Sequence, residues 1–270
     1  MKLSSRIGRF VTATNPVIVM AALAVTGITA QAQVLGSAAN YGVLAGSTVT
    51  NTGASVITGN VGVSAGTAIT GFPPGIILGG TQHSNDASAA QAQVDMFTAF
   101  TAINAEGATL ALTGQDLGGL TLTPGVYFFS SSAQLTGALT LNALGNANSR
   151  FDFIIGSTLT TASGSSVILE NGASGSNVFW AVGSSATLGT TTSFQGNVLA
   201  FASITANTGA TDPCGRLLAH TGAVTLDSNT IGGGCSGTSP DPGGRTPEPS
   251  ASVLLLCFGT ACFAARRRMK

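Results

Sequence analysis

The chain has little charge, and its body has almost no basic residues. Only 7% of its 270 residues are Asp, Glu, Lys or Arg. Residues 33–240 hold two basic and eight acidic residues, a net charge of −6. Such a body cannot neutralise a row of phosphates, which excludes nucleic acid as a partner. An apolar content of 44% with 37 glycines excludes disorder and disfavours ordinary helical packing.

The acidic residues are also scattered, which argues against catalysis. A solenoid lyase or hydrolase needs clustered carboxylates with a base, or aspartates that bind calcium. Only Asp212 and Asp227 lie near His220, and no phosphate loop, Ser/His/Asp spacing or metal-ligand set is visible. We therefore expect no enzyme, no cofactor and no metal site.

The N-terminus has the three parts of an export signal. Lys2, Arg6 and Arg9 precede an apolar stretch over 16–30, and Ala30-Gln31-Ala32 is a small-x-small cleavage site. We predict a signal peptide over 1–32 and maturation before Gln33.

The C-terminus carries a second targeting signal. A Pro/Gly linker over 239–249 cannot pack, and a short apolar segment with an arginine cluster follows over 250–270. The order of Pro247-Glu248-Pro249, apolar helix and Arg266-Arg267-Arg268 resembles the PEP-CTERM sorting tail of Gram-negative bacteria. That resemblance implies a transient inner-membrane tail, a sorting protease of exosortase type and a cell-surface or secreted product. A plain C-terminal anchor is the alternative.

Two of the four cysteines belong to the body. Cys214 and Cys235 lie in Gly-rich loops of an exported protein, 21 residues apart, and we predict a disulfide between them. A metal site would need further ligands close by.

Residues 84–106 contain no glycine or proline, and apolar residues recur there at helical spacing. Ala90, Val94 and Phe97 mark the apolar face. Ser84 or Asn85 can cap the start, and Gly107 ends the pattern. We predict a helix over about 84–106.

The rest of the body repeats one pattern: an aromatic or apolar strand, Ser or Ala, a Thr-rich strand, and Gly. Examples begin at Tyr41, Tyr127, Phe151, Val178 and Val198, and the later ones start about 20 to 27 residues apart. This period is typical of β-solenoid coils and favours an all-β dominated domain over 33–238.

Side chains alternate across a strand, so the Thr strand has an inward column and outward columns beside it. The inward residues are Val49, Leu135, Leu159, Leu188, Ile204 and Val224. The column after them is Thr50, Thr136, Thr160, Gly189, Thr205 and Thr225, and the column before them is Thr48, Gln134, Thr158, Thr187, Ser203 and Ala223. Threonine ladders can simply stabilise stacked strands. A solvated face would usually include charged residues, and this one has almost none.

A flat, charge-poor array of threonines is a lattice of hydroxyls and methyls. Stacked strands repeat at about 4.7–4.9 Å and alternate residues at about 6.6–6.8 Å, spacings comparable to repeats on ice surfaces. The stretches LGSAANYGVLAGSTVTNTG, LTPGVYFFSS, FDFIIGSTLTTASGSSVIL and NVFWAVGSSATLGTTTSFQGNVLA resemble the microbial ice-binding-protein family over about residues 34–235.

The resemblance implies a right-handed β-solenoid of triangular cross-section, one long helix alongside, and a first coil that does not stack in sequence order. It also implies ice binding by one flat face. Together with the outward columns, it gives these candidate residues: Thr50, Thr136, Thr158, Thr160, Thr187, Thr190, Thr205, Asn207 and Thr225. The alternative is a non-catalytic surface adhesin with the same fold, for which exopolysaccharide is the candidate partner.

Overall fold

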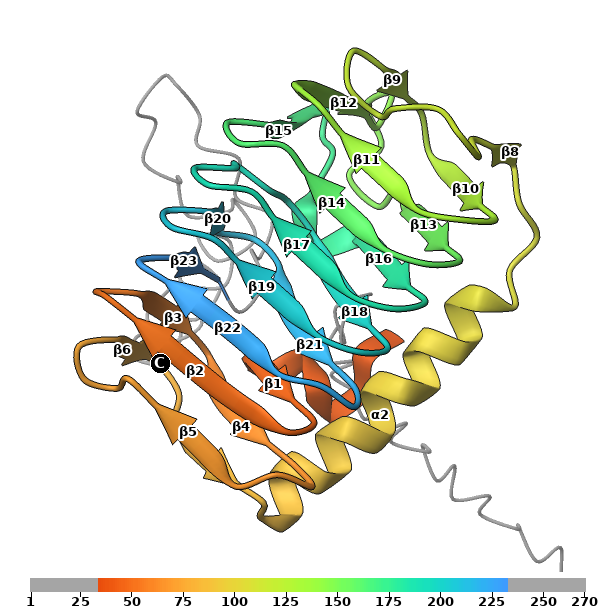
Figure 1. Cartoon of the computed structure of the whole chain (residues 1–270). Coiled ribbons are helices and arrows are strands. Elements are labelled where there is room, and N and C mark those ends of the chain that lie inside the picture. The colour runs from red at the N-terminus through yellow and green to blue at the C-terminus, as the bar shows by residue number, and fades with distance from the viewer. Residues whose placement is uncertain (1–33, 233–270) are drawn as a thin grey trace, which may run out of the picture.

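The repeat forms a stack of coils in which the chain passes through three parallel sheets in turn. The computed structural model describes residues 34–232 (Figure 1). We name the sheets A, B and C in the order in which each coil visits them. All strand pairs among the described residues are parallel, as in a stack of coils that wind in one direction.

The strands have the following bounds, in spatial order within each sheet. Sheet A contains β7 (Gln82–Ser84), β4 (Asn60–Val63), β1 (Tyr41–Ala45), β21 (Arg216–Ala219), β18 (Asn197–Ala200), β16 (Val178–Val182), β13 (Phe151–Ile155), β10 (Gly125–Phe129) and β8 (Leu110–Ala111). Sheet B contains β11 (Ala133–Leu135), β14 (Leu159–Thr161), β17 (Ala186–Leu188), β19 (Ile204–Ala206), β22 (Val224–Asp227), β2 (Thr48–Thr52) and β5 (Ala68–Thr70). Sheet C contains β9 (Thr121–Leu122), β12 (Ala138–Asn142) and β15 (Ser166–Glu170), then β20 (Thr211–Asp212), β23 (Thr230–Ile231), β3 (Val56–Thr58) and β6 (Ile76–Leu78). Ser193 bridges the two parts of sheet C.

The first coil, which begins with β1, stacks beside the last coil, which begins with β21. It does not stack beside the coil that begins with β8, which comes after α2 in the sequence. In sheet A, β1 lies between β4 and β21, and Val43 pairs with Leu217. The chain then runs along the stack as the helix α2 and starts again at β8, at the far end (Figure 1). This confirms the non-sequential first coil that the resemblance implied.

The interior of the stack is filled by the inward residues of all three sheets. It includes an aromatic stack in which Phe153 lies between Tyr127 and Trp180. The ring centroids of Phe153 and Trp180 are 3.8 Å apart, and Phe194 lies 4.9 Å from Trp180. Trp180 is fully buried, and its indole Nε1 donates a hydrogen bond to the carbonyl of Gln195. The period-2 alternation of the repeat thus supplies one continuous apolar core.

The helix α2 (Ala87–Asn104) covers sheet A together with the short helix η1 (Gly36–Asn40). Asp86 caps it: its Oδ1 accepts from the amide of Ala89 at 2.8 Å, whereas Ser84 and Asn85 had been expected to do so. The expected apolar face is also wrong, since Val94 is 60% exposed. The buried face is instead Ala89, Ala92, Met96, Ala99 and Ile103, packed on the outer side of sheet A. Three alanines allow close packing there, while Val94 points away. Among the described residues, no helix combines the length and apolarity needed to cross a membrane.

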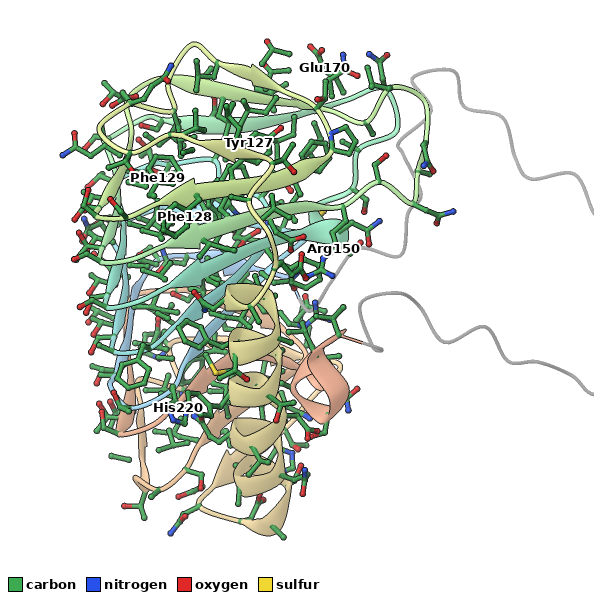
Figure 2. The ribbon with its side chains drawn as sticks, turned by 90° about the vertical axis from the view of Figure 1, so that its right-hand side faces the viewer. Tyr127, Phe128, Phe129, Arg150, Glu170 and His220 are labelled. Carbon is green, nitrogen blue, oxygen red and sulfur yellow. The ribbon has the colours of Figure 1, made fainter. Side chains whose placement is uncertain are left out.

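A three-residue ion cluster fastens the end of α2 to sheet A. Arg150 donates from Nε to Asp152 Oδ1 at 2.9 Å and places Nη2 3.0 Å from Glu106 Oε1. Figure 2 shows Arg150 close to this end of the helix. Asp152 is buried, and its pKa is raised to about 7. Burial is the largest cause, Arg150 acts to lower the pKa, and Glu106, a second carboxylate beside the first, adds to the rise.

Asp152→Asn is expected to flatten the pH dependence of the unfolding free energy between about pH 4 and pH 7. The folded pKa of Asp152 lies above its usual value of 3.8, so the folded state holds this proton more tightly. Its contribution to stability is complete below the unfolded pKa and is lost as the pH rises to about 7. Denaturant titrations of both proteins across this range measure the difference. The other carboxylates contribute equally to the pH dependence of both proteins. Equal slopes of the unfolding free energy against pH would therefore contradict the prediction.

Candidate functional site

Sheet B carries one outward column that runs the whole length of the stack. Strand pairing puts these seven residues in register: Gln134, Thr160, Thr187, Thr205, Thr225, Thr50 and Thr70. All seven are exposed or half-exposed. We call this column the threonine ladder.

The ladder contains five of the candidate residues and corrects the register of two coils. Thr50, Thr160, Thr187, Thr205 and Thr225 lie in it. Thr136 and Gly189 do not, although the alignment placed them there. In β11 and β17 the residue paired with the other inward apolar residues is an alanine, Ala133 or Ala186, two positions before the expected leucine.

This correction makes the ladder more regular than the sequence suggested. The expected interruption at Gly189 disappears because Thr187 occupies that rung, and Gln134 occupies the rung given to Thr136. Thr70, which pairs with Thr50 at the end of the sheet, was not among the residues expected from the sequence. Six of the seven rungs are threonine.

The remaining candidates flank the ladder. Thr158 precedes β14 and donates to Ser132 Oγ of the neighbouring coil at 2.8 Å. Thr136 and Asn207 follow their strands directly, and Thr190 lies in the turn after β17. Asp227 pairs with Thr52 on the same edge, so a carboxylate interrupts this side of the face. The uncharged part of the face therefore consists of the threonine ladder and the residues that connect sheet A to sheet B just before it.

The backbone under the ladder is held rigidly. The inward residues Leu159, Ile204 and Val224 are fully buried. The buried hydroxyl of Thr161 in β14 has partners: its Oγ1 accepts from the amide of Gly189 at 2.8 Å and lies 2.8 Å from Thr192 Oγ1. Threonine side chains are themselves limited at χ1 by their branched β-carbon. The ladder thus has fixed hydroxyl and methyl positions.

Other predicted features lie partly outside the described residues. Cys235 lies there, so the disulfide with Cys214 stays a prediction, and so does the signal peptide over 1–32; the sorting tail also lies outside the described residues. Residues 34–232 contain no cluster of His, Cys, Asp and Glu that could hold a metal ion.

Comparison with known proteins agrees with the geometry. A family model described as Ice-binding-like matches residues 43–232, and the PEP-CTERM protein-sorting motif matches residues 245–268. A protein of Nostoc sp. (strain HG1) named ice-binding protein is 53% identical over 243 residues, which are 89% of this chain and 89% of that one.

Two crystal structures of ice-binding proteins also superpose well. One, from the Antarctic ascomycete Antarctomyces psychrotrophicus, has a TM-score of 0.72 and 50% identity, and the match covers 75% of this chain and 98% of that one. The other, from an Antarctic biological consortium, has a TM-score of 0.70 and 47% identity over 84% and 95% of the two chains. These matches give no support to exopolysaccharide as a partner or to the adhesin alternative.

Proposed function

Because the chain belongs to the Ice-binding-like family, we propose that it binds ice through the threonine ladder of sheet B. The observation that supports this most directly is the seven-rung register, with threonine at six rungs and no charge. The relatives are named for ice binding, and the ladder is a surface of this chain that suits such a ligand.

The proposed mechanism needs no chemical step. The rungs repeat at about 4.7–4.9 Å, and each threonine presents a hydroxyl that holds water and a methyl that limits the mobility of that water. Water ordered on this lattice can join the ice lattice. Each contact is weak, but the rigid ladder makes many at once and loses little conformational entropy on binding. The protein is accordingly proposed to be non-enzymatic, with a right-handed solenoid of triangular section as its frame.

The experiment for the wild type is partition into slowly growing ice. We expect the purified protein to concentrate in the ice fraction, whereas a protein without ice affinity is rejected into the liquid. The same samples should inhibit recrystallisation of fine-grained ice. A wild-type protein that stays in the liquid would end the proposal.

The match to the PEP-CTERM motif indicates export and surface sorting, and we propose that the tail is removed in the process. We expect the mature protein to begin at Gln33 and to end near Pro249, because the linker over 239–249 can present the cut away from the coils. Intact-mass analysis of protein from the native host checks both ends. A surface fraction that still ends at Lys270 would show that the tail is retained.

A further inference from the structure

The turn after β20 begins with a buried aspartate that is followed by an exposed proline. Asp212 is the last residue of β20 and is 0% exposed, whereas Pro213 lies at the surface. The nitrogen of a proline belongs to a tertiary amide and carries no proton. The peptide bond between the two residues therefore joins a buried acid to an exposed amine. The same dipeptide occurs a second time in the chain, at Asp241-Pro242.

The carboxyl group of Asp212 has one bonded and one unbonded oxygen. Its Oδ1 accepts from the amide of Gly196 at 3.2 Å, but its buried Oδ2 has no hydrogen-bond partner among the described residues. Buried polar atoms nearly always have partners, so a carboxyl group that only held the turn would be expected to use both oxygens. The lone pairs of Oδ2 are thus available for a reaction within the protein.

The backbone carbonyl of the same residue accepts two amide hydrogen bonds. The amide of Gly232 donates to it at 2.9 Å, and the amide of Gly215 lies 3.4 Å away. Two amide donors on one carbonyl oxygen stabilise the negative charge that forms when a nucleophile adds to the carbon. Gly215 also lies against the carboxyl group, because a β-carbon at this position would collide with Oδ2. The carboxyl group and the carbonyl of Asp212 therefore meet at one glycine.

The surroundings of Asp212 also favour its neutral form. Burial raises the pKa of its carboxyl group well above the usual value of 3.8. The amide of Gly196 and the guanidinium of Arg216 act to lower this pKa, and burial outweighs both. Among residues 34–232, Arg216 is the one charged side chain that acts on this group. The acid thus keeps its proton at pH values at which an ordinary aspartate is ionised.

We propose that the bond between Asp212 and Pro213 is a self-cleavage site of the folded protein. Oδ2 of Asp212 attacks the carbonyl carbon of the same residue and closes a cyclic anhydride. The carboxyl proton passes to the nitrogen of Pro213, and the bond between carbon and nitrogen breaks. Water then opens the anhydride and leaves an α-carboxyl and a side-chain carboxyl at Asp212. The sum is the hydrolysis of one peptide bond by one water molecule.

Burial of the carboxyl group does not obstruct this reaction. The nucleophile and the carbonyl belong to one residue, so the first step needs no bound substrate and no open pocket. The exposed Pro213 puts the broken bond within reach of water.

The cut would divide the last coil and the sorting motif over 245–268 from the rest of the protein. The strand β21 remains paired with β18 and with β1, which belong to the other fragment. The two parts are therefore expected to stay together until the protein unfolds.

The test is incubation of the purified protein at about pH 6, where a carboxyl group of ordinary pKa is ionised, followed by mass spectrometry in denaturant. The matched control within the chain is Asp241-Pro242, which belongs to the linker over 239–249. We expect the fragment that ends at Asp212 to accumulate about tenfold or more faster than the one that ends at Asp241. In urea at about pH 2 the two bonds should break at similar rates, which shows that the assay detects both.

Three outcomes would overturn the proposal. The folded protein could keep both Asp-Pro bonds intact at about pH 6, or it could break both at the same rate. The third outcome is a cleavage rate that rises with protein concentration or falls with protease inhibitors, because a reaction within one molecule does neither. Cys214 and Cys235 both follow the cut, so a disulfide between them would not join the fragments and hide the result.

Variants assign the reaction to its residues. Asp212→Asn resembles the neutral acid in shape but has no carboxyl group, and we expect no cut at this position. Pro213→Ala changes an exposed residue and replaces the basic proline nitrogen with a poorer leaving group, so the cut should slow several-fold. Pro242→Ala is the matched control and should leave cleavage after Asp212 unchanged.

Circular dichroism checks that the three variants are folded. If Asp212→Asn does not fold, Pro213→Ala still decides, because unchanged cleavage in that variant would overturn the proposal. None of these measurements involves ice, so this test and the test of the threonine ladder fail independently.

Discussion

Thr225→Tyr is expected to lower ice recrystallisation inhibition by about tenfold or more, a loss of at least about 1.4 kcal/mol in adsorption free energy. Thr225 is an inner rung of the threonine ladder, with Thr205 and Thr50 on either side. A tyrosine ring would project above the plane and keep neighbouring rungs away from a flat ice surface. Tyrosine is a good strand residue, so the fold should persist. Dilution series of both proteins in a recrystallisation assay measure the effect.

The matched control is Thr230→Tyr. Thr230 lies in the same coil and is also exposed, but it belongs to β23 of sheet C. It should retain wild-type activity, and both variants should keep a β-rich circular dichroism spectrum. If the two substitutions reduce activity equally, sheet B is not the binding face. If neither does so while the wild type is active, the ladder is not the contact surface.

Trp180→Ala is expected to lower the free energy of unfolding by about 3–5 kcal/mol, the usual cost of removing a large buried aromatic side chain. Trp180 is fully buried and stacks on Phe153 at 3.8 Å. The loss would leave a cavity in the middle of the stack and an unpaired carbonyl at Gln195. Urea unfolding followed by circular dichroism measures it. Fluorescence cannot, because this is the chain's one tryptophan.

Phe201→Ala serves as the comparison, since it removes an aromatic ring of which 41% is exposed. Its effect on the unfolding free energy should be a small fraction of that of Trp180→Ala. A loss below about 1 kcal/mol for Trp180→Ala would mean that the surrounding residues collapse into the cavity, contrary to what a tightly stacked core predicts.

The coils and the Thr-rich strand of sheet B could be predicted from the sequence, but the register of every rung could not. The coils and this strand are visible because apolar and threonine residues alternate within a few neighbouring positions. The predicted register was wrong in β11 and β17, because the inward residues there are Ala133 and Ala186. In a chain rich in small residues, these alanines resemble residues of the turn before the strand. A better signal was present: the distance from the end of the sheet A strand to the inward residue is the same in most coils. Measured from Phe129 and Val182, that distance selects the two alanines.

The buried face of α2 depends on tertiary packing, which the sequence pattern did not reveal. Two rows of apolar residues on α2 have helical spacing, and packing on sheet A selects the row with Ala92 and Ala99. The stacking order is likewise a tertiary feature, because Gly46 and His220 are neighbours only after the first coil is placed beside the last.

The position of β1 between β4 and β21 also governs when the protein can fold. The amide of Asn229 donates to Ser55 Oγ across 174 residues of chain, so this part of the stack closes only after nearly all of the domain has been made. Contacts of such long sequence separation are slow to form, because the loop between them must lose its freedom first. A ribosome-bound chain that ends before β21 leaves the first coil with an open edge. The native stack is therefore expected to complete itself late, after synthesis, even though most of its other coils pair with their immediate neighbours.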